Sequence, residues 1–104
     1  MNTATNERYV TDLGDRIGVL TAQINSLNVE LAAVVGAFDQ AGGWGGGGFR
    51  SMAHWLGFRA GWSNTDASRL ARVGARLDTI PTLTAAADRG EICLAMLDAA
   101  ARIT

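Results

Sequence analysis

The sequence predicts an all-α fold in which one long N-terminal helix precedes a compact cluster of about four shorter helices. Apolar residues recur at alternating spacings of three and four over residues 10–38, which is the period of one helix face. Serine caps, helix-ending glycines and a single proline divide residues 51–104 into short helical segments. No segment reads as a strand, so we expect one helical domain spanning residues 1–104.

The composition is that of a small folded domain. The chain has 104 residues, of which 48% are hydrophobic and 18% are charged, and this excludes an intrinsically disordered chain. Because Cys93 and His54 are the only residues of their types, an internal disulfide and a multi-ligand zinc site within one copy are excluded. Residues 1–7 lack the pattern of a signal peptide, and no apolar run has membrane-spanning length. We therefore expect a cytoplasmic protein with no membrane partner.

The long helix, over residues 1–41, is predicted by an apolar stripe that is spaced as in a coiled coil. The stripe consists of Val10, Leu13, Ile17, Leu20, Ile24, Leu27, Leu31, Val34 and Phe38. Few charges flank it to select a partner helix, so packing of the stripe against the rest of its own domain is the favoured interpretation. The alternative is a homodimer formed through the 10–38 helix. Gly14, Gly18 and Gly36 each cost this helix about 1 kcal/mol relative to alanine.

A glycine-rich loop over residues 42–50 ends the long helix. Gly42 suits the left-handed conformation that closes a helix, and residues 45–48 are all glycine. No Gly-Lys-Ser/Thr sequence follows, so the loop does not have the pattern that cradles phosphates, and we expect it to act as a hinge.

Residues 51–104 are predicted to form the helical cluster. Ser51 and Gly61 bracket a first helix of about nine residues, with bulky packing groups at Met52, Trp55, Leu56 and Phe58.

A second helix opens at Ser63 and Asp66, which resemble a capping box, and is expected to run to about Thr79. Pro81 starts a short third helix that Gly90 closes. The final helix is expected over residues 92–103, with its apolar face formed by Ile92, Leu94, Met96, Leu97, Ala100 and Ile103.

The first two helices of the cluster, joined by Gly61-Trp62-Ser63, are predicted to form a helix-turn-helix-like pair, and the second carries an arginine stripe. Arginine can bond guanine edges in pairs and can also hold phosphates. We therefore predict a DNA-contacting surface. The residues nearest the bases are Asn64, Thr65, Ser68, Arg69 and Arg72, and those on the phosphate backbone are Arg50, Arg59 and Arg76. The alternative is that these arginines are solvated and that some pair with Asp66 or Asp78.

The charges are unevenly distributed along the chain. Residues 1–48 contain two arginines against five carboxylates, whereas residues 50–76 contain five arginines against one aspartate. The basic middle segment is therefore where an anionic partner would bind.

No set of residues indicates catalysis. His54, between aromatic residues, is expected to be a packed or capping group, and nothing marks Cys93 as a nucleophile. We therefore expect no enzyme activity, no cofactor, no metal and no small-molecule substrate.

Several short motifs occur in order over roughly residues 27–104. They are the run 31–39 followed by Gly42-Gly43-Trp44, the run 50–56 with Gly61 and Ser63 behind it, the residues Ala67, Arg69, Val73, Ala75, Leu77 and Pro81, and the turn Gly90-Glu91-Ile92. Together these motifs resemble the actinobacterial DUF222 family, also called 13E12 repeat proteins. The resemblance implies a helical region that usually precedes a C-terminal HNH nuclease domain, and hence a mobile-element or nuclease context.

This sequence departs from the family pattern. The HNH part is absent, so the chain is similar to a truncated family member or to an excised N-terminal fragment of one. Cys93 stands where the family tends to have serine, and basic residues common in the last helix are missing between positions 93 and 101. A weaker similarity, Ser…Arg…Leu-x-x-Ile-Pro…Gly-Glu-Ile, is to the helix-turn-helix of ParB-type partition proteins. The expected function is a non-catalytic DNA-binding or DNA-positioning module, and the alternative is a protein-interaction or dimerisation domain.

Overall fold

The fold is all-α, as the sequence predicts. The computed structural model describes residues 3–103, so residues 1, 2 and 104 of the expected domain lie outside the described residues. The helices are α1 (Thr3–Gln40), α2 (Met52–Ala60), α3 (Asn64–Gly74), the 3₁₀ helix η1 (Leu77–Thr79), α4 (Pro81–Asp88) and α5 (Leu94–Arg102). Within residues 3–103 there is no strand, and the predicted long helix followed by four shorter α-helices is confirmed.

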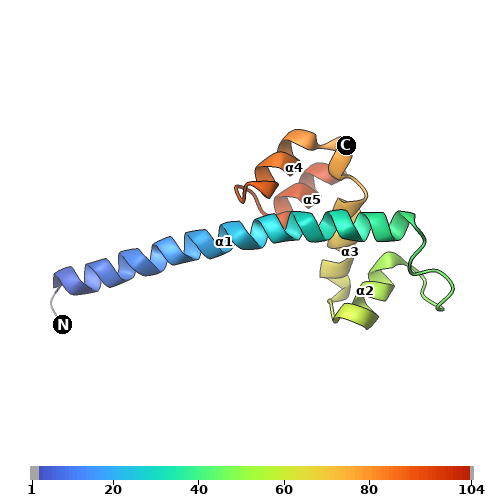
Figure 1. Ribbon diagram of the computed structural model, residues 1–104, viewed down its shortest axis with the longest axis horizontal. Coiled ribbons are helices and arrows are strands. Elements are labelled where there is room, and N and C mark those ends of the chain that lie inside the picture. Colours follow the sequence, from blue (N-terminus) through green and yellow to red (C-terminus); the bar gives the residue numbers. More distant parts are fainter. Residues whose placement is uncertain (1–2, 104) are drawn as a thin grey trace.

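α1 extends far beyond the cluster formed by α2–α5. In Figure 1 its N-terminal half runs away from the other helices, while α4 and α5 lie above its C-terminal half and α2 lies below. The longest dimension is 63 Å and the Cα radius of gyration is 17.4 Å, against about 13 Å for a compact domain of this length. The excess comes from the projecting part of α1.

α3 is the central helix of the cluster, because it packs against α1, α2 and α5. Its Leu70 and Val73, together with Leu97 of α5, are the largest fully buried side chains. The same core contains Val29, Ala32 and Val35 of α1 and Met52 and Leu56 of α2.

The apolar stripe is not the face of α1 that packs on the cluster. The buried residues of α1 are Asn25, Val29, Ala32, Val35 and Gly36. The stripe residues from Val10 to Leu27, and Val34, are between 38% and 64% exposed, and only Leu31 and Phe38 are half-buried against the core. The prediction that the stripe packs within its own domain is therefore wrong for most of its length.

Two glycines explain the choice of face. A Cβ on Gly36 would lie 2.5 Å from the carbonyl oxygen of Gly74, and one on Gly74 would lie 2.6 Å from the carbonyl oxygen of Ala32. α1 and α3 therefore approach until their backbones meet, which side chains as large as those of the stripe would prevent.

A second contact fixes the turn between α4 and α5 on α1. The Asn25 Nδ2 donates a hydrogen bond to the carbonyl oxygen of Gly90 at 3.1 Å. Gly90 closes α4, as predicted, with a φ of 84°. A Cβ there would lie 2.7 Å from the Ala22 Cβ, so both its conformation and its surroundings require glycine.

Two predicted helix boundaries are corrected. α3 ends at Gly74 rather than near Thr79, because the chain tightens into η1 ahead of Pro81, whose ring disfavours helical geometry in the residue before it. The final helix begins at Leu94, with Cys93 in extended geometry before it.

Three side chains predicted to pack are exposed instead. Phe58 is 74% exposed, Met96 56% and Ile103 87%. Residue type and helical spacing do not indicate where a short helix ends or which of its side chains extend beyond the neighbouring helices.

By length and composition alone, α1 could cross a membrane, a criterion that core helices of soluble proteins also meet. In this fold 17% of the apolar segment that meets the criterion is buried.

Candidate functional surfaces

α2 and α3, which the sequence predicts as a helix-turn-helix-like pair, have their ends set by local hydrogen bonds. The Ser51 Oγ accepts from the His54 N–H, and the Ser63 Oγ accepts from the Asp66 N–H, each at 3.1 Å. Between the helices, Gly61 adopts a φ of 74° and reverses the chain. The caps predicted at Ser51, Gly61 and Ser63 are therefore confirmed.

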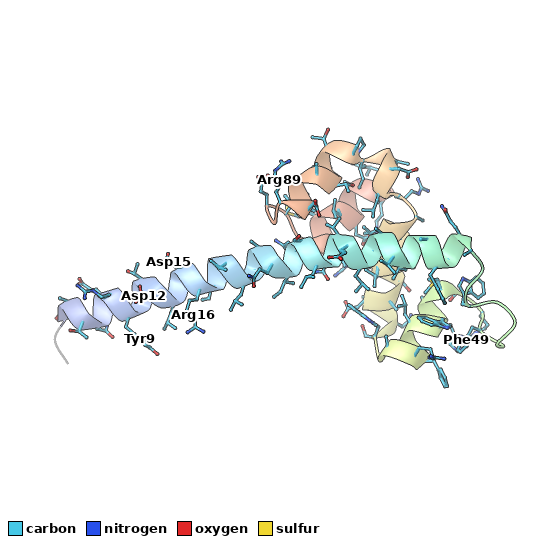
Figure 2. The ribbon with its side chains drawn as sticks, viewed as in Figure 1. Tyr9, Asp12, Asp15, Arg16, Phe49 and Arg89 are labelled. Atoms are coloured by element: carbon cyan, nitrogen blue, oxygen red, sulfur yellow. The ribbon has the colours of Figure 1, made fainter. Side chains whose placement is uncertain are left out.

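His54 is itself a capping residue, as predicted. Its Nδ1 accepts a hydrogen bond from the Arg50 N–H at 3.1 Å. Its ring and that of Phe49 form an edge-to-face contact, with ring centroids 5.3 Å apart, and Figure 2 shows Phe49 beside α2. The imidazole thus holds the entry of the chain into α2.

Arg72 is bound within the fold rather than directed at a partner. Its Nε and Nη2 donate hydrogen bonds to the two carboxylate oxygens of Asp98 at 2.8 and 3.0 Å. Asp98 lies on α5, and its side chain is only 5% exposed. This two-point geometry is the strong form of an arginine–carboxylate pair, and it ties α3 to α5.

Two further arginines surround the same carboxylate. The Nε of Arg69 lies 3.6 Å and the Nη2 of Arg102 lies 3.3 Å from the Asp98 Oδ2. The hydrogen bond from Arg72 is the main cause that lowers the pKa of Asp98, the charges of Arg102 and Arg69 add to it, and burial opposes it. Asp98 is therefore held ionised as the centre of a structural ion cluster.

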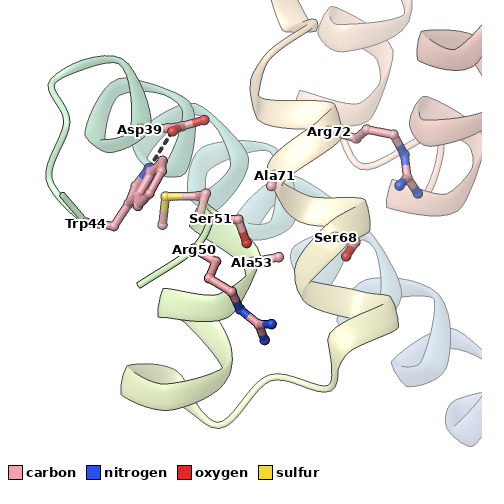
Figure 3. Close-up of a pocket in the computed structure, with 9 residues that line it drawn as sticks. Asp39, Trp44, Arg50, Ser51, Ala53, Ser68, Ala71 and Arg72 are labelled. Atoms are coloured by element: carbon pink, nitrogen blue, oxygen red, sulfur yellow. Dashed lines mark hydrogen bonds between the residues drawn. The ribbon is translucent and has the colours of Figure 1, made fainter. Parts of the chain in front are cut away.

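A hollow of about 450 Å³ lies between the N-terminus of α2 and α3. Figure 3 shows that Arg50 and Arg72 both border it but point in different directions, Arg72 toward α5. Ser68 also lines the hollow. At its far side the Trp44 Nε1 donates to the Asp39 Oδ1 at 2.6 Å, which anchors the glycine-rich loop.

The eight predicted DNA-contacting residues therefore divide into two groups. Arg69, which is half-buried, and Arg72, whose side chain is 42% exposed, belong to the Asp98 ion cluster. The other six lie outside that cluster: Ser68 is half-buried beside the hollow, and Asn64, Thr65, Arg50, Arg59 and Arg76 are exposed. Within residues 3–103, the last three arginines form no ion pair. The guanidinium of Arg59 lies 5.7 Å from the centroid of the Trp55 ring, and Arg76 follows the end of α3.

An apolar groove continues the exposed stripe of α1. It encloses about 240 Å³ and is lined by Leu31, Val34, Val35, Phe38, Met52, Trp55, Leu56, Ala60 and Trp62. Within its lining, the rings of Phe38 and Trp55 contact each other in a tilted arrangement, with 4.5 Å between centroids. Stripe and groove together form one apolar surface on the side of α1 away from Asn25 and Gly36.

The sequence interpretation missed the role of Asp98. This residue is the only carboxylate in the apolar segment 92–103, and Arg102 follows it by one helical turn. An isolated acid on an apolar helix is a signal of a buried ion pair, because a buried charge without a partner is costly.

Among the described residues, no group of three histidine, cysteine, aspartate or glutamate side chains could hold a metal ion. Comparison of the chain with protein-family models, curated proteins and solved structures finds no match. The resemblance to the DUF222 family stays a prediction.

Proposed function

We propose that this chain is a helical protein-interaction domain that presents the stripe of α1 to another apolar helix. The observation that carries the proposal is that the stripe is exposed while the core forms on a different face of the same helix. Exposed apolar surface of this extent marks an interaction site, because leaving it in water is unfavourable.

The other faces of α1 support a one-sided contact. Figure 2 shows Asp12, Asp15 and Arg16 on the projecting half of the helix, away from the cluster. Charges around the rest of the helix keep it hydrated, so the apolar contact is confined to the stripe.

The test is whether the stripe is dispensable for folding. Replacing Leu20 and Ile24 by Asp (L20D/I24D) places two negative charges on the stripe. The control variant replaces Thr11 and Val19 by Asp (T11D/V19D); these residues are exposed on the opposite side of α1, so the same charge is added away from the stripe. All three tryptophans lie outside α1, so their fluorescence reports on the cluster. At low protein concentration we expect L20D/I24D and T11D/V19D to melt at the wild-type temperature. Unfolding of the cluster by L20D/I24D alone would show that the stripe is part of the core and would refute the proposal.

A second candidate function, DNA contact by α2 and α3, is favoured by the exposed arginines that lack a carboxylate partner. Arg50 and Arg59 are exposed, and so is the first turn of α3, the part of a helix-turn-helix that meets DNA. Because Arg69 and Arg72 are engaged by Asp98, this candidate rests on phosphate contacts, which are sensitive to salt and insensitive to sequence.

The DNA candidate is tested by fluorescence anisotropy on a labelled duplex across a salt series. R50A/R59A is compared with R8A/R16A, which removes the same charge from the projecting end of α1. We expect only R50A/R59A to weaken binding and to flatten the log–log salt slope by about 2, since each phosphate contact contributes about 0.9. Equal effects of the two variants would indicate nonspecific attraction and would exclude this surface.

A further inference from the structure

We propose that the helix that covers the stripe is α1 of a second copy of this chain, in a parallel, two-stranded coiled coil. The contact would run along a seam defined by Val10, Leu13, Ile17, Leu20, Ile24 and Leu27. This inference rests on the interaction function proposed above and names the partner. The seam residues are 38–64% exposed, although they are among the most apolar side chains of the protein.

The order of residue types along the seam identifies the partner. Val10, Ile17 and Ile24, which are all β-branched, recur every seven residues at one seam position. Leu13, Leu20 and Leu27 recur every seven residues at the other. This separation fits a parallel pair, in which like positions of two copies meet, and it favours two strands over three or four.

The residues beside the seam permit this pairing. In a parallel pair, Arg16 would lie near Thr21 of the second copy and Gln23 near Asn28 of the second copy. No two like charges meet, and the two amides can hydrogen-bond to each other. Because these flanking residues add little attraction, the apolar layers must supply the affinity, and we expect a dissociation constant in the micromolar range.

The cluster does not obstruct the seam. It packs on Asn25, Val29 and Ala32, which lie well round the helix from the seam. α2 reaches the line of the stripe only beyond Leu27, where the ring of Trp55 contacts that of Phe38. The seam therefore ends where the second helix would first meet α2, and most of it lies on the part of α1 that projects in Figure 1.

The exposed area agrees with a missing partner. The chain has a solvent-accessible surface of 6845 Å², whereas a folded monomer of this mass exposes about 5,600 Å². Pairing of two seams would cover on the order of 1,000 Å², near the lower limit for specific protein interfaces.

The experiment measures mass and orientation separately. Sedimentation equilibrium of the wild type, L20D/I24D and T11D/V19D over a concentration series tests for the second copy. We expect a monomer–dimer equilibrium in the wild type and T11D/V19D, and a shift of at least 100-fold toward monomer in L20D/I24D. If the wild type stays a folded monomer at a protein concentration of about 100 micromolar, its dissociation constant for dimerisation lies above the micromolar range. That result would overturn this proposal but leave the interaction function standing. Unfolding of L20D/I24D would overturn both.

Orientation is tested by disulfide trapping in the C93S background, which removes the only native cysteine. In a parallel pair two Ile17 positions face each other, so I17C should form a disulfide-linked dimer under mild oxidation. In an antiparallel pair over the same seam, Ile17 would instead face Leu20 of the second copy, so the two I17C thiols would not meet. Failure of I17C to form the linked dimer, or sedimentation as a trimer, would overturn the parallel, two-stranded arrangement.

Discussion

Arg72 of α3 and Asp98 of α5 are joined by two hydrogen bonds, at 2.8 and 3.0 Å, across the centre of the cluster. The arginine face of α3, which the sequence analysis predicts to contact DNA, is therefore the face that holds the last helix in place. Removal of the carboxylate leaves three arginines close together, so its loss is predicted to affect folding before any binding.

Asp98→Asn is expected to lower the free energy of unfolding at pH 7 by about 1.5–3 kcal/mol, because the buried carboxylate loses its charge-assisted hydrogen bonds to the partly exposed Arg72. Urea denaturation followed by tryptophan fluorescence measures the change. Asp66→Asn is the matched control, since Asp66 is 55% exposed and 4.0 Å from Arg69, and we expect it to cost less than about 1 kcal/mol. Equal losses in the two variants would contradict the role assigned to Asp98.

The stability of the wild-type chain should fall in acid. The pKa of Asp98 is lower in the folded state than its ordinary value, chiefly because of the Arg72 hydrogen bond. Its contribution is therefore complete above the unfolded-state pKa of about 3.9, and it is lost as the pH falls through the folded-state pKa. Urea midpoints between neutral pH and pH 2 should fall more steeply for the wild type than for Asp98→Asn. Parallel curves would contradict this account. Glu91 also has a lowered pKa through Arg89, but that pair is exposed and is common to both proteins.

Gly36→Ala and Gly74→Ala should each destabilise the chain by about 1–3 kcal/mol, because a Cβ at either position meets backbone atoms of the other helix. Gly18→Ala is the control: nothing lies within 4 Å of a Cβ there, so the variant should gain up to about 1 kcal/mol from helix propensity. Thermal unfolding would resolve these opposite signs. A gain in all three variants would show that α1 and α3 do not meet at their glycines.

Cys93→Ser should stabilise the protein by about 1 kcal/mol. Cys93 has the extended geometry of a helix N-cap, but its side chain makes no capping hydrogen bond, whereas a serine hydroxyl can accept one from the first turn of α5. Ser63→Ala, which removes an existing cap, should cost about the same amount. Denaturation under reducing conditions gives both values, and an unchanged C93S midpoint would contradict the prediction.

Local features were predictable because the chemistry that encodes them is local. Ser51, Gly61 and Ser63 set the ends of α2 and the start of α3 through contacts within three to five residues. The glycine-rich loop and the closing role of Gly90 follow in the same way from backbone conformations that favour glycine.

The face of α1 that packs could not be deduced from periodicity, since the apolar stripe is the stronger signal. What decides the packing is the fit of Gly36 against Gly74, two residues 38 positions apart, which no single helix pattern contains. The same is true of the candidate site, because the partner of Arg72 lies 26 residues away on another helix. Spacing places the arginines on one face of α3, but it does not show that a carboxylate of α5 packs against that face.

The glycine contact also makes α1 a lever. The backbones of α1 and α3 meet at Gly36 and Gly74, and Gly90 rests on Ala22, so the helix cannot slide along the cluster without a clash. The part of α1 before Ala22 is an arm of about 30 Å. A tilt of the cluster by about 10° would therefore move the tip of the arm by about 5 Å, roughly the pitch of a helix. A partner bound to the arm would therefore be displaced by about one helical turn when α2–α5 rotate by a small angle.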